Sequence, residues 1–119
     1  MCARDNGATT SHLQQQLPPG EQIEVATTAL RMLADPTRLR LLWLLRDTEM
    51  DVAGLTAATG AARPAVSQHL AKLRLAGLVA VRRDGRRAFY TARGRHVRRL
   101  VDEVLAATHH HLTGATDHD

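Results

Sequence analysis

Histidine is the residue type in this sequence with the clearest capacity for metal chemistry. The chain has seven histidines and a single cysteine, Cys2. Imidazole nitrogen binds nickel, cobalt, copper and zinc alike, so the residue type alone does not select the ion. Four of the histidines lie at or just beyond the two ends of the last predicted helix, residues 95–110, and they are His96, His109, His110 and His111. The others are His12, His69 and His118.

One copy of that helix cannot bring its two groups of histidines to a single ion. His96 and His110 lie within about 40° of one face but about 21 Å apart along the helix axis. Two antiparallel copies, at the interface of two subunits, could bring His96 of one near the partner's His109 and His110, and symmetry would then make two equivalent sites. Three consecutive histidines point in three directions, so at least one is not expected to be a ligand. The alternative interpretation of these histidines is that they form a solvated helix end and bind no metal.

Other groups could assist in metal binding. If Met1 is removed, Cys2 could chelate nickel through its amine, amide and thiolate, although a disordered arm is the simpler expectation. Asp102 and Glu103 could accept hydrogen bonds from a ligand imidazole, or simply face solvent. A single thiol cannot form a disulfide within its own chain, which agrees with a reducing compartment.

Positive charge is concentrated in one part of the chain. The sequence has 16 Lys and Arg residues against 12 Asp and Glu residues, a formal net charge of +4. Most of the basic residues lie between Arg63 and Arg99, where Asp84 is the only acidic residue. A solvated surface normally mixes both signs, whereas a concentrated basic face is typical of a protein that binds a polyanion. The charge pattern therefore favours nucleic-acid binding.

Several other functions are excluded. No apolar run approaches the roughly 20 residues of a membrane-spanning helix and no signal peptide opens the chain, so we expect a cytoplasmic protein. No serine or cysteine nucleophile has a histidine and an acid at a recognisable spacing. There is also no glycine-rich phosphate loop and no pair of carboxylates in an apolar setting. We therefore expect a binding protein and not an enzyme.

Helical periodicity dominates the first half of the chain, beginning at Glu21. Asp35 is a natural N-cap and Pro36 suits a first helical turn, so a second helix is expected to start there. This helix is apolar nearly all round, which predicts that it is buried at the centre of the core. The expected organisation is a flexible arm at 1–19, one domain at 20–112 and a flexible tail at 113–119.

Two short helices joined by a tight turn follow, at residues 52–59 and 64–76, each ending at a glycine. Such a pair forms a helix-turn-helix. In its second helix Val66, Leu70 and Leu73 recur at the spacing of a core face. The outward face is then expected to carry Ser67, Gln68, His69 and Lys72.

After Gly77 the periodicity changes from 3.6 residues to 2. Residues 78–83 and 86–91 flank Asp84-Gly85, a strong signal for a β-hairpin with a tight turn. The order of four helices, a hairpin and a last helix predicts a winged helix-turn-helix, mainly α with a small β-hairpin.

In that fold, the second helix of the helix-turn-helix would lie in the major groove of DNA. Ser67, Gln68 and His69 have the length and chemistry to reach base edges, and Lys72 and Arg74 would meet phosphates. The hairpin arginines would reach a flanking backbone or minor groove. The full set of expected DNA contacts is Arg63, Ser67, Gln68, His69, Lys72, Arg74, Arg82, Arg83, Arg86 and Arg87.

The stretches ALRMLADPTRLRLLWLL, SQHLAKLRLAGLV and RRDGRRAFY resemble the ArsR/SmtB family of small metal-responsive repressors. The resemblance covers roughly residues 22–112, most of the chain. It implies a homodimer joined through the first and last helices, which releases a palindromic operator when an inducer binds. Release is the usual response in the family, and the sequence leaves co-repression open.

The resemblance also bears on which inducer is sensed. Family members that sense arsenic or cadmium carry paired cysteines at the start of the helix-turn-helix, whereas residues 50–55 contain none, which excludes thiolate sensing of that kind. Zinc sensors of the family place an Asp two residues before the first histidine ligand and a His eleven residues after it. This chain has Gly94 and Ala107 at those positions, which argues against a four-coordinate zinc site.

The histidine spacing is similar to that of the family's nickel and cobalt sensors, of the NmtR and KmtR kind. Those carry a His at the start of the last helix, ligands thirteen and fourteen residues later, and further tail histidines. His96, His109 and His110 fall on the matching positions, and His111 or His118 could complete the set of ligands.

The sequence therefore predicts a metal-responsive transcriptional repressor that binds palindromic operator DNA as a homodimer. Nickel(II) or cobalt(II) is the favoured effector at the last helix, and zinc(II) is less favoured. Two alternatives stay open. One is a metal-independent winged-helix regulator controlled by a protein partner, and the other is a metal-buffering protein with no preference for any DNA sequence.

Overall fold

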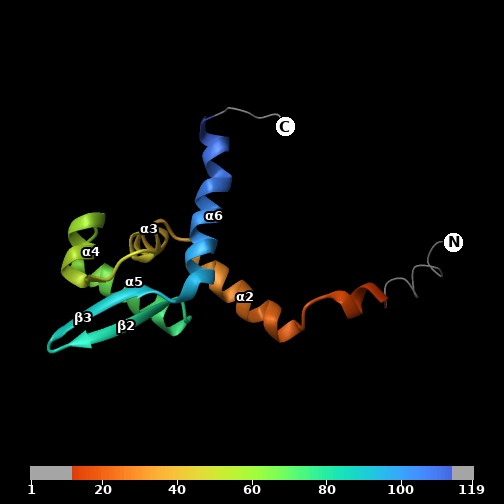
Figure 1. The fold of residues 1–119 in the computed structure, drawn as a ribbon, viewed down its shortest axis with the longest axis horizontal. Coiled ribbons are helices and arrows are strands. Elements are labelled where there is room, and N and C mark those ends of the chain that lie inside the picture. Colours follow the sequence, from red (N-terminus) through yellow and green to blue (C-terminus); the bar gives the residue numbers. More distant parts are fainter. Residues whose placement is uncertain (1–11, 114–119) are drawn as a thin grey trace.

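The predicted winged helix-turn-helix is present in a computed structural model that describes residues 12–113 (Figure 1). The flexible segments were predicted at residues 1–19 and 113–119. Residues 1–11 and 114–119 lie outside the described range. Residues 12–16, within the predicted arm, are helical. The remaining elements are α2 (Gly20–Leu33), α3 (Pro36–Leu45), β1 (Met50–Asp51), α4 (Val52–Thr59), α5 (Arg63–Leu75), β2 (Val79–Asp84), β3 (Arg87–Ala92) and α6 (Gly94–Thr113).

The hydrophobic core lies where α3, α4, α5, the sheet and the start of α6 meet. The predicted inner face of α5 is confirmed, because Val66, Leu70 and Leu73 are all fully buried. Burying each such side chain contributes about 1.5–3 kcal/mol. The other fully buried side chains are Leu41, Leu42, Leu45, Leu55, Val79 and Val101.

Helix α3 begins as predicted but is less buried than predicted. The Asp35 carboxylate accepts a hydrogen bond from the backbone N–H of Arg38 at 3.0 Å, and Pro36 opens the helix. The predicted place in the core is confirmed for Leu41, Leu42 and Leu45, which are fully buried, but the other side of the helix is not buried, because Trp43 is 44% exposed and Arg40 is also exposed. In the described part of the chain, α4, α5 and α6 pack on the Leu41, Leu42 and Leu45 side and leave the opposite side open.

The end of α5 turns the chain into the sheet. Gly77 adopts a φ of +77°, the left-handed conformation that ends many helices. The N–H of Leu78 donates to the carbonyl of Leu73 at 2.9 Å, and that of Gly77 donates to the carbonyl of Arg74 at 3.0 Å. These two bonds form a Schellman motif and point β2 back along α5.

The sheet has three antiparallel strands in the order β1-β3-β2. Strand β1 was not predicted, because its two residues are too few to show alternation. The hairpin is confirmed, but its turn lies one residue later than predicted, since Asp84 pairs with Arg87 and leaves Gly85 and Arg86 as the two turn residues. Gly85 has a φ of +65° and takes the first turn position, where tight hairpin turns need a positive φ.

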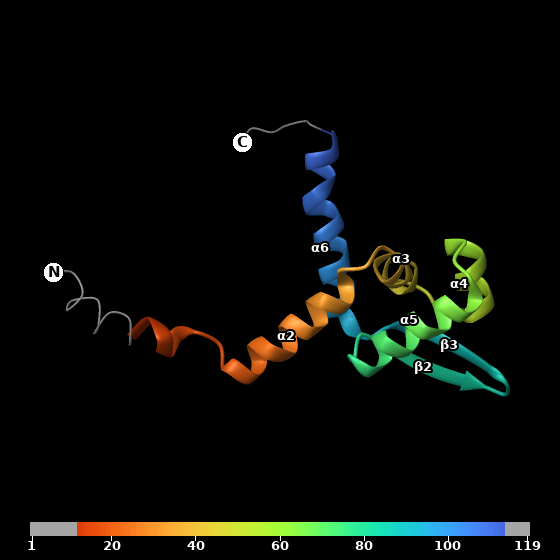
Figure 2. The ribbon, with the colours of Figure 1, turned by 180° about the vertical axis from the view of Figure 1, so that it is seen from behind.

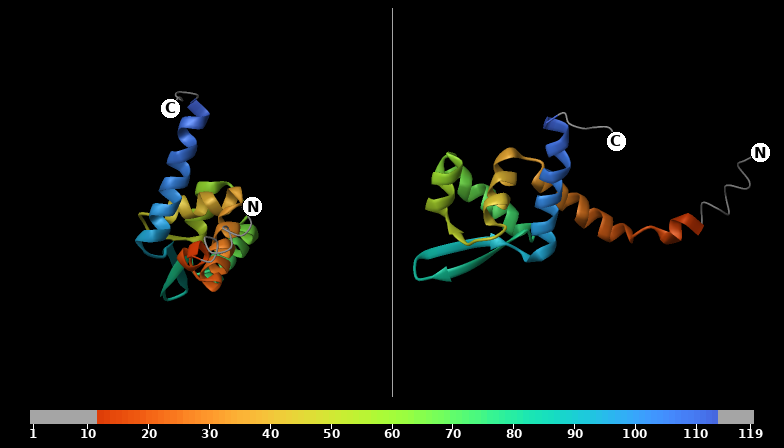
Figure 3. Two further views of the ribbon diagram at one scale, coloured as in Figure 1. Left: turned by 90° about the vertical axis from the view of Figure 1, so that its right-hand side faces the viewer. Right: turned by 45° about the horizontal axis from the view of Figure 1, so that its top comes forward.

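Two helices extend away from this body (Figures 1 and 2). Helix α2 leads outward toward the N-terminus, and α6 rises beside α3 (Figure 3), so the chain measures 66 × 37 × 23 Å. Three apolar side chains of α2 are about half exposed or more, namely Ile23, Val25 and Leu30. None of the helices in the described range has the length and apolar character needed to cross a bilayer.

Candidate nucleic-acid interface and metal-binding residues

The α4–α5 pair has the geometry of a helix-turn-helix. The Asp51 side chain caps α4 by accepting a hydrogen bond from the Gly54 N–H at 2.9 Å, and α4 ends at Gly60. Pro64 lies in the first turn of α5. Because α5 buries its apolar face, its polar face is presented to solvent. The exposed residues of the predicted contact set on α5 are Arg63, Ser67, Gln68, Lys72 and Arg74.

His69 does not belong to that exposed face, and the expectation that it points outward is wrong. Its side chain is only 21% exposed and turns toward the start of α3. Arg38 Nη1 lies 3.2 Å from His69 Nδ1, and Asp35 Oδ2 lies 4.0 Å from His69 Nε2. The helical periodicity placed His69 on the outward face, but the direction of its side chain depends on Arg38, a neighbour 31 residues earlier in the chain.

The wing formed by β2 and β3 is tied to the residues that precede α4. Arg82 makes a two-pronged ion pair with Glu49, with nitrogen to oxygen distances of 2.9 to 3.2 Å. Arg87 Nη2 donates to Asp51 Oδ2 at 2.7 Å. Asp51 therefore caps α4 with one carboxylate oxygen and holds the wing with the other.

These ion pairs shift the titration of both acids. The hydrogen bond from Arg82 lowers the pKa of the Glu49 carboxyl. The hydrogen bond from Arg87, followed by that from the Gly54 N–H, lowers the pKa of Asp51. The two guanidinium groups also lie over the Phe89 ring, each 4.8 Å from its centre. The two arginines thus hold the wing in place through contacts within the protein.

Arg83 and Arg86 differ from Arg82 and Arg87. Both are exposed near the tip of the wing, and within residues 12–113 neither has an ion pair or a hydrogen bond through its side chain. The sequence predicted one role for all four arginines, because alternation along a strand does not reveal cross-strand acids 33 and 36 residues away.

Four of the predicted metal ligands lie on α6, where the length of the helix separates His96 from the other three. His96 is exposed in the first turn, whereas His109, His110 and His111 occupy the last turns, about 20 Å away along the axis. Among the described residues, no three histidine, cysteine or acidic side chains gather closely enough to hold an ion. Two other candidates, Cys2 and His118, lie outside the described residues.

Asp102 on α6 is half exposed and is paired with an arginine of α3's C-terminal end. It accepts a 2.7 Å hydrogen bond from Arg46 Nη1, and the Arg46 guanidinium also lies 4.3 Å from the centre of the Trp43 ring. This contact ties the end of α3 to α6. Glu103 is exposed.

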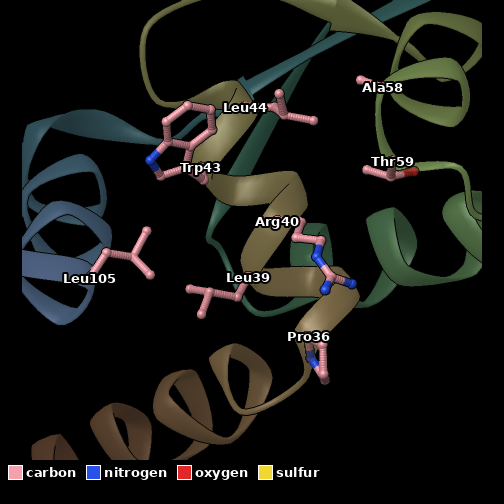
Figure 4. A pocket seen from close by; sticks show the side chains of 8 residues that line it. All are labelled: Pro36, Leu39, Arg40, Trp43, Leu44, Ala58, Thr59 and Leu105. Atoms are coloured by element: carbon pink, nitrogen blue, oxygen red, sulfur yellow. The ribbon is translucent and has the colours of Figure 1, made fainter. Parts of the chain in front are cut away.

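A groove that was not predicted runs along the open side of α3 (Figure 4). Its volume is about 570 Å³, and its lining is mostly apolar. Leu105 of α6 lies on one side of α3, and Ala58 and Thr59 of α4 lie on the other. The residues of α3 that line it are Pro36, Leu39, Arg40, Trp43 and Leu44.

The sequence of this chain is similar to those of bacterial transcriptional regulators. A family model described as "Bacterial regulatory protein, arsR family" matches residues 35–81. The HTH-type transcriptional regulator KmtR of Mycobacterium tuberculosis is 50% identical over 92 residues, which cover 76% of this chain and 71% of that protein. The regulator NmtR of the same organism is 39% identical over 94 residues, covering 79% of this chain and 78% of that protein.

Solved structures show the same fold. One is the homodimeric winged helix-turn-helix DNA-binding domain of a possible ArsR-family transcriptional regulator from Mycobacterium bovis. It matches with a TM-score of 0.74 and 31% identity, over 83% of this chain and 92% of that chain. Another, HlyU from Vibrio cholerae, matches with a TM-score of 0.68 and 31% identity, over 79% of this chain and 97% of that chain.

Proposed function

Because this chain belongs to the arsR family of bacterial regulatory proteins, we propose that it binds operator DNA as a homodimer and responds to nickel(II) or cobalt(II). The family and its relatives are transcriptional regulators, so the expectation that the chain is not an enzyme is confirmed. Such a regulator would act in the cytoplasm, where bacterial DNA lies. The observation that carries the DNA-binding proposal is the exposed polar face of α5. Beside it lies a wing whose Arg83 and Arg86 make no side-chain ion pair or hydrogen bond within residues 12–113.

In this proposal α5 enters the major groove. Ser67 and Gln68 reach base edges, where hydrogen bonds distinguish the base pairs. The wing places Arg83 and Arg86 near a flanking phosphate or the minor groove. Phosphate contacts position the protein and make its affinity depend on salt. The residues of α5 assigned to phosphates are Arg63, Lys72 and Arg74.

The homodimer is proposed from the two helices that leave the body. Ile23, Val25 and Leu30 expose apolar surface on α2, and Val104 is partly exposed on α6. Covering these side chains with a second copy would remove apolar surface from water. The matching protein from M. bovis is described as homodimeric. A symmetric pair would hold two copies of α5 for the two halves of a palindromic operator.

The residues of α6 fit a metal ion only if two chains contribute. Their donors are imidazole nitrogens, which suit nickel and cobalt and also bind zinc. In an antiparallel pair of α6 helices, His96 of one chain would come near the partner's His109 and His110, with His111 or His118 as a further ligand. An ion there would link the two subunits. It could thus couple the dimer geometry to DNA affinity, and DNA would affect metal affinity by the same factor.

The experiment combines metal titration with DNA binding. Purified protein is titrated with nickel, cobalt and zinc by calorimetry, and fluorescence anisotropy follows its affinity for a duplex that the protein has selected from a random library. We expect one nickel or cobalt ion per subunit and a change in DNA affinity of about tenfold, or about 1.4 kcal/mol.

The variant His96→Ala should lose this response and keep its metal-free DNA affinity, and His12→Ala is the matched control on a residue outside α6. If zinc changes the DNA affinity more than nickel and cobalt do, zinc is the effector and the proposed one is wrong. Unchanged DNA affinity with every ion would leave a metal-independent regulator, and metal binding without any DNA preference would indicate a metal buffer.

A further inference from the structure

His69 lies in a polar contact that joins three helices. Arg38, near the start of α3, donates from Nη1 toward His69 Nδ1 on α5 at 3.2 Å. The same guanidinium donates from Nε to the carbonyl oxygen of Met32 on α2 at 2.6 Å. Asp35, which caps α3, lies with Oδ2 4.0 Å from His69 Nε2. We call Asp35, Arg38 and His69 the corner cluster.

The hydrogen-bond donors and acceptors around His69 favour one tautomer of its neutral imidazole ring. A guanidinium has only donors, so His69 Nδ1 must accept from Arg38. The proton of the neutral ring is then on Nε2, facing the Asp35 carboxylate. With that tautomer each ring nitrogen meets a complementary neighbour. The opposite tautomer would place an N–H against the guanidinium.

The corner cluster gives α5 a directional contact, which its apolar contacts do not provide. Val66, Leu70 and Leu73 attach α5 to the core, and this attachment is non-directional. A hydrogen bond is directional, and its strength falls steeply when its angle changes. The contact at His69 therefore resists rotation of α5 about its own axis. Ser67 and Gln68 directly precede His69, so the same contact sets where their side chains point.

We infer that His69 is a positioning residue that holds the recognition helix against the α2–α3 corner and does not itself read bases. This inference rests on the proposed DNA-binding function. Met32 belongs to α2, whose exposed face is assigned above to the dimer, so the cluster also links the dimer helix to the DNA-reading helix.

The test compares three variants on the library-selected duplex, on copies with single base-pair changes, and across salt concentrations. His69→Leu removes the acceptor and keeps the bulk. His69→Asn restores an acceptor close to the position of Nδ1. Gln68→Ala is the control for an exposed residue that reads bases. Urea unfolding of each variant measures any general loss of stability.

For His69→Leu we expect roughly tenfold weaker binding, as for the loss of one hydrogen bond to a charged group. The ranking of the changed duplexes and the salt slope should stay the same, His69→Asn should recover most of the affinity, and Gln68→Ala should alter the ranking at one base pair. Nitrogen NMR of the wild type should show the His69 proton on Nε2.

Three results would overturn the inference while leaving the proposed function intact. They are a changed base preference in His69→Leu, unchanged affinity in that variant, or an Asn variant no better than the Leu variant. If the wild type selects no DNA sequence from the library, the proposed function fails and the positioning role fails with it.

Discussion

The four arginines of the wing allow the DNA-binding geometry to be tested with two variants of equal charge. Arg83 and Arg86 are exposed and make no side-chain ion pair or hydrogen bond within the described residues, whereas Arg82 and Arg87 are paired with acids of the same chain. We therefore expect the double variant Arg83→Gln/Arg86→Gln to lose phosphate contacts. The double variant Arg82→Gln/Arg87→Gln should lose the contacts that hold the wing.

The magnitude follows from counterion release. Each phosphate contact contributes about 0.9 to the slope of log affinity against log salt concentration. Two arginines on each of two wings should therefore lower the slope by roughly 3.6 in the Arg83/Arg86 variant. Between about 50 and 200 mM salt, the affinity of the variant should therefore fall by roughly a hundredfold less than the affinity of the wild type.

The assay is anisotropy on one duplex over this salt range. The Arg82/Arg87 variant should bind more weakly at every salt concentration because its wing is released, with a slope within about 1 of the wild type. Equal slope changes in the two variants would refute the reasoning, because they would show that total charge matters and that the individual ion pairs do not.

Three further predictions address the wing, the metal response and the core. Because the pKa values of Glu49 and Asp51 are lowered in the folded chain, the hold on the wing should be complete above their ordinary values of 4.5 and 3.8 and lost as pH falls through the lowered values. Hydrogen exchange in β3 as a function of pH measures this, and unchanged exchange on acidification would contradict it. His109→Ala should weaken nickel binding in calorimetry without changing metal-free DNA affinity, and an unaffected nickel isotherm would remove His109 from the ligand set. Leu70→Ala should destabilise the chain by about 2–5 kcal/mol, because Leu70 is fully buried in the core, and urea unfolding checks this value.

In both the wing contacts and the corner cluster, a helix-capping aspartate also contacts another element. In both, a side chain that caps a helix also holds an arginine or faces a histidine from another element. Asp51 does so for the wing and Asp35 for the recognition helix. The helix-turn-helix is thus joined to its neighbours at the N-termini of α3 and α4, where a carboxylate caps each helix.

Much of the fold could be predicted from the sequence, because its signals are local. Asp35 before Pro36 indicates a helix start through hydrogen bonds within one turn. Gly77 indicates a helix end because a left-handed backbone conformation is least costly at glycine. The core face of α5 is readable because helical spacing alone puts Leu70 and Leu73 on one side. The order of the helices and the hairpin follows from such signals, whereas the two-residue strand β1 does not.

The partners of individual polar side chains could not be predicted, because they are set by residues distant in the sequence. His69 turns inward since Arg38 lies opposite it. Arg87 on β3 meets Asp51 because β1 pairs with β3, and Arg82 on β2 meets Glu49, which directly precedes β1. Periodicity gives the direction of a side chain from its own element but carries no information about what faces it. The sequence by itself therefore determined which part of the chain is basic and which face of α5 is buried in the core. Only the tertiary structure decided which of those polar groups are free to contact a ligand, because a contact depends on two elements meeting in space.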